Sequence, residues 1–178
     1  MILNNRLRNI RRLLALFIVC LFLSGLTAIP VEWQLRTILN TLSDESRLHI
    51  FLSYILEGYT EMATQYPFLV YGYDWLAFAH FVLAILFIGP YRDPVKNIWV
   101  IEFGLIACVL VLPYAAVMGQ VRGLPVWWRL CDCSFGVVGF ALLWIVRKKI
   151  GALTKTSSGP ASKPVINIGN TLYQNTNF

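Results

Sequence analysis

Five polar residues in or next to apolar stretches are the first candidates for chemistry. They are Asp74, Gln120, Arg122, Arg129 and Asp132. Guanidinium groups bind phosphate through paired hydrogen bonds, and carboxylates can hold such groups in place. The combination predicts a ligand site for an anionic lipid head group or another phosphate, in which Gln120 supplies a further hydrogen bond.

The same residues also fit a purely structural role. An ionisable side chain at the centre of a membrane-spanning helix costs about 2.5 to 3.5 kcal/mol, and an opposite charge nearby reduces that cost. Asp74 and Asp132 are expected at similar depth, with Arg129 one turn above Asp132. A salt-bridged cluster that locks three helices together is therefore the alternative to a ligand site.

His80 and Glu102 are further ionisable residues within apolar runs. His80 is expected either as a hydrogen-bonded core histidine or as a member of a proton relay. Glu102 is expected to pair with Arg92 or Lys96, and its alternative role is also proton relay.

No residue pattern predicts a metal, a cofactor or a catalytic nucleophile. Cys131 and Cys133 are two residues apart, so on a helix their thiols point in different directions and do not share a metal. Neither a nucleotide-binding loop nor a nucleophile triad is found. The chain is therefore interpreted as non-catalytic.

The elements that must position these residues are apolar helices. The 178 residues are 57% hydrophobic and only 13% charged, which is too apolar for a soluble domain of this length. Four runs approach the length of about 20 residues that crosses a bilayer. We predict an all-α membrane protein, an antiparallel four-helix transmembrane bundle in one domain, 1–149, with a polar cytoplasmic tail, 150–178. The predicted transmembrane runs are 13–29, 69–88, 98–118 and 126–146.

Two connections between these runs carry specific expectations. The segment 31–68 contains apolar residues at helical spacing, with Ser43 as a helix N-cap, and predicts an amphipathic helix on the outer side. The connection at 89–97 is short and contains two prolines, so the runs 69–88 and 98–118 are expected to be neighbours.

One face of the last run contains Arg129, Asp132, Gly136, Gly139 and Leu143 at helical spacing. Glycines let a neighbouring membrane helix approach closely. This stripe is therefore expected to face another helix and not lipid.

The distribution of basic residues predicts the orientation. Eleven of the fifteen lie before the first run, between the second and third, or after the fourth. Since basic residues gather on the cytoplasmic side, we predict a multi-pass protein of the bacterial cytoplasmic (inner) membrane with both termini inside. Topology accounts for the positive charge, and no nucleic-acid partner is expected.

The order of polar residues in the second half is itself a motif. Asp74 and His80 share an apolar run, and a glutamine, an arginine, an aspartate and two spaced glycines come later. These later residues are Gln120, Arg129, Asp132, Gly136 and Gly139. The pattern resembles the VanZ-like family of small bacterial membrane proteins, although the gap from Asp74 to His80 is longer than the family's. The resemblance implies a role in the cell envelope.

These expectations lead to one interpretation of function and one alternative. The chain is interpreted as an accessory subunit of a membrane complex or a lipid-interacting envelope protein. Its partners would be the lipid bilayer and other membrane subunits, the latter through the outer segment and the C-terminal tail. The alternative is an enzyme or transporter that acts on a phosphorylated lipid at the outer face, through Arg122, Arg129, Asp132 and Asp74.

Overall fold

The computed structural model describes residues 2–157, and within this part of the chain 86% of the residues are helical and none is in a strand. The helices are α1 (Ile2–Thr27), α2 (Val31–Leu39), α3 (Arg47–Gln65), α4 (Pro67–Leu86), α5 (Ile88–Arg92), α6 (Ile98–Val121) and α7 (Val126–Ser157). Four segments are long and apolar enough to cross a membrane, and they contain α1, α4 with α5, α6, and α7. The predicted all-helical, multi-pass class is confirmed.

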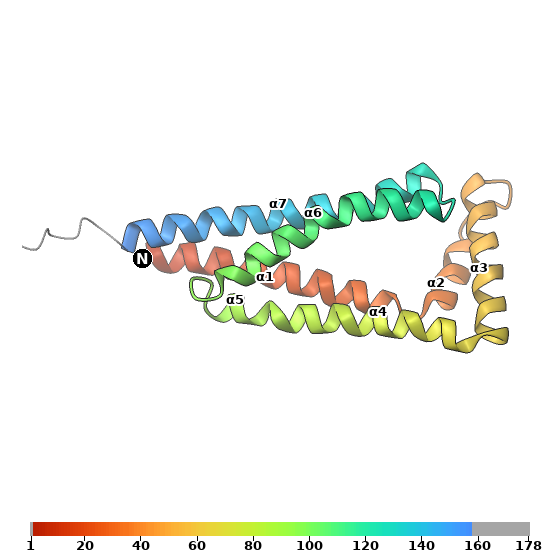
Figure 1. The fold of residues 1–178 in the computed structure, drawn as a ribbon, viewed down its shortest axis with the longest axis horizontal. Helices are drawn as coiled ribbons and strands as arrows, with labels where there is room; N and C mark the ends of the chain where they lie inside the picture. Colours follow the sequence, from red (N-terminus) through yellow and green to blue (C-terminus); the bar gives the residue numbers. More distant parts are fainter. Residues whose placement is uncertain (1, 158–178) are drawn as a thin grey trace, which may run out of the picture.

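The long helices are arranged as two pairs (Figure 1). α1 packs along α4, α6 packs along α7, and a smaller contact joins α1 to α7. The expectation that the short connection at 89–97 makes the second and third membrane helices neighbours is wrong. After α5 and the turn that follows it, α6 packs against α7 and not against α4. The helix that packs against α4 is α1.

The glycine stripe of α7 does face another helix. A Cβ atom added to Gly136 would lie 2.8 Å from the carbonyl oxygen of Cys108 in α6, and one added to Gly139 would lie 2.9 Å from Cys108 Sγ. Leu143, further along the same face, is fully buried. The predicted close approach of two helices at this stripe is confirmed.

The buried core lies where the N-terminal half of α1 meets α5, the start of α6 and the C-terminal half of α7. We call this region the basic end, formed by residues 5–17, 87–104 and 143–154 (Figure 1). Its core residues are Ile10, Leu14, Phe87, Val100, Ile101, Leu143, Val146, Ile150 and Leu153. Ile150 and Leu153 therefore belong to a packed helix where the sequence predicted a polar tail. The rest of that tail, 158–178, lies outside the described residues.

At the opposite end the two helix pairs diverge, and α3 extends from one pair to the other (Figure 1). We call this region, formed by α2, α3 and the adjoining ends of α4, α6 and α7, the α3 end. The Phe51 ring packs against Trp127 and Trp128 of α7, with centroids 5.1 and 5.5 Å apart. The Tyr59 ring packs against Tyr73 of α4 at 5.7 Å. Aromatic contacts therefore attach α3 to both pairs.

The main helix of the segment 31–68 begins later than the sequence indicated. Ser46, and not Ser43, is the N-cap, since its side chain accepts a hydrogen bond of 3.0 Å from the backbone N–H of His49. Ser43 instead closes the preceding turn, where its carbonyl oxygen accepts from the N–H of Ser46. A separate short helix, α2, precedes this turn.

Candidate functional site

Arg129 lies across α6 and is not paired with Asp132. A Cβ atom added to Gly119 would lie 2.5 Å from Arg129 Cγ and Cδ, so the arginine stem covers a glycine of α6. Its Nη1 donates a long hydrogen bond of 3.4 Å to the carbonyl oxygen of Ala116, and its Nε is buried without a hydrogen-bond partner. The guanidinium group thus connects α7 to the backbone of α6.

Asp132 follows Arg129 by one turn and is half-buried. Within residues 2–157, its carboxylate forms no ion pair or hydrogen bond. Gln120 and Arg122 are exposed at the end of α6, where Gly123 adopts a positive φ of 69° and turns the chain into α7. Four of the five candidate residues are therefore on the α6–α7 pair without any ion pair between them.

Asp74 belongs to a different part of the molecule. It is exposed on α4, beside the rings of Tyr71, Trp75 and Phe78, with which it lines a shallow pocket of about 230 Å³. Burial raises the pKa of Tyr59 in α3, and the nearby Tyr73, Glu32 and Asp74 raise it further. Asp74 therefore lies near Tyr59 of α3, whereas Arg129 lies against α6.

The two proposed relay residues have different surroundings. His80 Nδ1 lies 2.8 Å from the carbonyl oxygen of Leu76, one turn back in its own helix. Glu102 Oε1 accepts a hydrogen bond from Arg147 Nε at 3.0 Å and forms an ion pair with Arg147 Nη2 at 2.9 Å. The expectation that Glu102 pairs with Arg92 or Lys96 is wrong, because α7 and not the 89–97 turn lies beside this face of α6.

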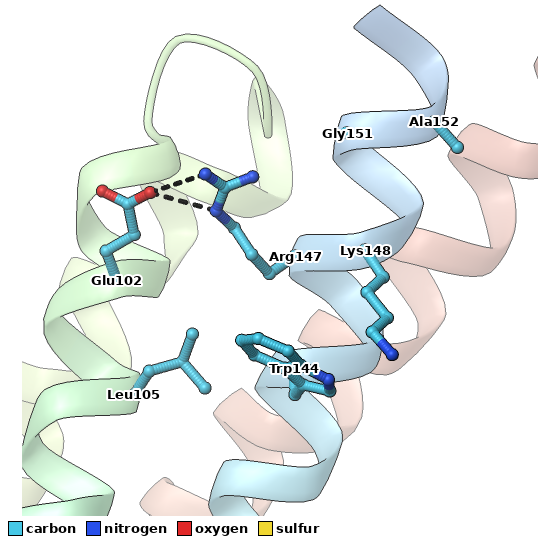
Figure 2. A pocket seen from close by; sticks show the side chains of 7 residues that line it. All are labelled: Glu102, Leu105, Trp144, Arg147, Lys148, Gly151 and Ala152. Atoms are coloured by element: carbon cyan, nitrogen blue, oxygen red, sulfur yellow. Dashed lines mark hydrogen bonds and ion pairs between the residues drawn. The ribbon is translucent and has the colours of Figure 1, made fainter. Parts of the chain in front are cut away.

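A pocket at the basic end surrounds the Glu102–Arg147 pair (Figure 2). It is lined by Glu102, Leu105, Trp144, Arg147, Lys148, Gly151 and Ala152. Sequence reasoning missed this pocket, because it used the basic residues after the fourth run only to predict the orientation. The spacing of Trp144, Arg147, Lys148 and Gly151, which places them on one helical face, is the signal that could have found it.

Among the described residues, no group of three or more His, Cys, Asp or Glu side chains could hold a metal ion. No family model matches the chain, and comparison with curated proteins and with solved structures likewise gives no match. The class of this protein is therefore defined only by its fold and its membrane-length helices. It is a multi-pass helical membrane protein.

Proposed function

We propose that this chain is a non-catalytic subunit of a larger membrane complex, and that it contacts its partner with the α3 end and with Asp132. It would be an antiparallel four-helix transmembrane bundle of the bacterial cytoplasmic membrane, with both termini inside and α3 as an amphipathic outer helix. The similarity of its second half to the VanZ-like pattern supports a role in the cell envelope.

The observation that carries the proposal is the unpaired carboxylate of Asp132. A carboxylate without a partner in a membrane-spanning helix costs about 2.5 to 3.5 kcal/mol at the helix centre, and less near the end, where Asp132 lies in the second turn of α7. The nearest arginine in sequence, Arg129, donates to a backbone carbonyl of α6 and does not offset this cost. A cation or hydrogen-bond donor on a helix of another subunit would do so.

The exposed apolar residues of α3 support the same proposal. Ile50 and Tyr54 of α3 are 61% and 74% exposed. Trp33 of α2 is 68% exposed as well. Large apolar side chains grouped on one outer segment are typical of a surface that packs against protein or against the membrane interface.

The test compares two aspartates in the full chain, extracted from its own membranes in mild detergent. Asp132→Asn removes the unpaired charge. Asp93→Asn is the control, since it removes a charge at the basic end and keeps the oxygen that accepts from the N–H groups of Val95 and Lys96. We expect the native chain and the Asp93 variant to elute as part of a larger assembly, and the Asp132 variant to elute alone with unchanged helicity. Elution of all three as the same free monomer would contradict the proposal.

A second candidate function is action on a phosphorylated lipid at the α3 end. The exposed guanidinium of Arg122 and the unpartnered Nε of Arg129 favour it, since both have free hydrogen-bond donors. Arg129→Ala and Asp132→Asn should then abolish a lipid-dependent phenotype while the protein still folds and inserts. Loss of the protein itself would instead indicate that these residues stabilise the α6–α7 pair.

A further inference from the structure

The pocket at the basic end has a volume of about 680 Å³ and opens between α6 and α7 (Figure 2). Trp144, Arg147, Lys148 and Gly151 come from one face of α7, and α6 supplies Glu102 and Leu105 from its first two turns. Since Gly151 has no side chain, the space beside the Arg147 guanidinium stays open. The pocket lies far along both helices from Arg122 and Asp132.

Cations outnumber carboxylates in this pocket. The hydrogen bond from Arg147 Nε and the ion pair with Arg147 Nη2 both end on the same oxygen, Glu102 Oε1, so Arg147 Nη1 keeps its donors free. Lys148 Nζ lies 5.4 Å from the centre of the Trp144 ring, and among the residues that the structure describes it has no carboxylate partner. A single carboxylate therefore faces two positive charges, and both cations retain hydrogen-bond donors for a further anion.

The pocket also changes from apolar to cationic along the helix axis. Leu105 and Trp144 lie toward the middle of the two helices, whereas Arg147 and Lys148 lie one turn nearer the end of α7. Tryptophan, lysine and arginine gather at the boundary between the hydrocarbon and the head groups of a bilayer. A molecule with an anionic head and an apolar chain matches this order of side chains.

We propose that this pocket binds the phosphate of an anionic lipid head group. Arg147 through Nη1 and Lys148 through Nζ donate to the phosphate oxygens, Glu102 offsets part of their positive charge, and Trp144 and Leu105 contact the first carbons of an acyl chain. A free phosphate ion offers the same oxygens but lacks the chain. This site is independent of the proposed partner contact at Asp132 and of any lipid chemistry at the α3 end.

The experiment measures binding of three probes to the purified full chain in non-ionic detergent. The probes are short-chain phosphatidylglycerol, short-chain phosphatidylcholine and inorganic phosphate. Lys148→Gln is compared with Lys149→Gln, which removes the same charge from the next residue, an exposed lysine outside the pocket. A lysine near an anionic lipid contributes about 1 kcal/mol, so we expect Lys148→Gln to weaken phosphatidylglycerol binding about fivefold. Lys149→Gln should change it by less than about twofold.

Glu102→Gln gives a change of opposite sign. Removing the carboxylate leaves two unopposed cations, so binding of phosphatidylglycerol should become tighter, whereas loss of a merely structural ion pair would not strengthen it. Equal weakening by the two lysine variants would overturn the proposal, because it would indicate surface attraction without a site. Equal affinity for phosphatidylcholine would overturn it too. Binding of inorganic phosphate without tighter binding of phosphatidylglycerol would overturn the lipid assignment in favour of a free anion.

Discussion

The basic end and the α3 end of this molecule are held together by different interactions. At the basic end, side chains from α1, α6 and α7 are completely buried, among them Ile10, Ile101 and Leu143. At the α3 end, the two helix pairs diverge, and aromatic rings of α3 contact both of them. The difference indicates that one end provides the stability of the bundle, while the other leaves Asp74 and Asp132 accessible to further molecules.

The largest expected effect comes from removing volume at the basic end. Leu143→Ala should lower the free energy of unfolding by about 2 to 5 kcal/mol, because it leaves a cavity between α6 and α7. Leu130→Ala, in the same helix, truncates a side chain that is 64% exposed and should cost less than about 0.5 kcal/mol. Denaturant titration in mixed micelles measures both. Equal costs would show that the basic end is not the stable part.

Adding volume at the same end should cost less. A Cβ atom on Gly104 would lie 2.6 Å from Leu143 Cδ1 and 2.8 Å from Phe87 Cζ, both of which belong to buried side chains. Gly104→Val should therefore destabilise the protein by about 1 to 3 kcal/mol. No atom lies within 4 Å of a Cβ atom added to Gly72, so Gly72→Val is the control. Thermal unfolding in detergent should give a lower midpoint temperature for Gly104→Val than for Gly72→Val. A similar fall of the midpoint in both variants would contradict the packing described.

At the α3 end, Phe51→Ala should affect local opening more than overall stability. The variant loses contacts with two tryptophan rings, which are worth about 1 kcal/mol. This loss should shift the equilibrium for local opening of α3 by about fivefold. Hydrogen exchange of the α3 amides should accelerate by about that factor, with the rates in α6 unchanged. Tyr54→Ala, at a ring that is 74% exposed, should leave the exchange as it is. Faster exchange in both variants would mean that the Phe51 contacts do not fasten α3.

The smallest effect on stability is expected from the ion pairs, at both ends. The side chains of Glu102 and Arg147 are 47% and 37% exposed, and those of Glu32 and Arg36 are 45% and 55% exposed. Glu102→Gln and Glu32→Gln should each change the free energy of unfolding by less than about 1 kcal/mol, since exposed pairs are screened by solvent. The same denaturant titration measures them. A loss above about 2 kcal/mol for Glu102→Gln alone would make this pair part of the core.

The sequence predicted the helices and one packed face well, because these depend on local spacing. Four membrane-length apolar runs and the positions of Gly136, Gly139 and Leu143 on one face follow from helical periodicity, and the structure confirms them. The prediction that Ser43 is the N-cap of α3 was wrong by one helical turn. Several polar residues compete for that position, and in the structure Ser46 caps the helix while Ser43 closes the preceding turn and Asp44 pairs with His49.

The side-by-side arrangement of the helices could not be predicted in the same way. Counting residues along a helix gives the depth of a side chain, and Asp74 and Asp132 do have similar expected depths, but depth does not say which helix lies beside which. α4 packs against α1 and α3, while α7 packs against α6. The partner of Glu102 was missed for the same reason, since Arg147 is 45 residues away in sequence.

The divergence of the two helix pairs has a mechanical consequence. A protein that is compact at one end and spread at the other occupies unequal areas in the two leaflets of a bilayer. Lateral tension or curvature that expands one leaflet then acts on the angle between the two helix pairs. Because α3 contacts both pairs, it limits how far that angle can open. Bilayer shape, and not only a dissolved ligand, is thus a variable to which this molecule is mechanically coupled.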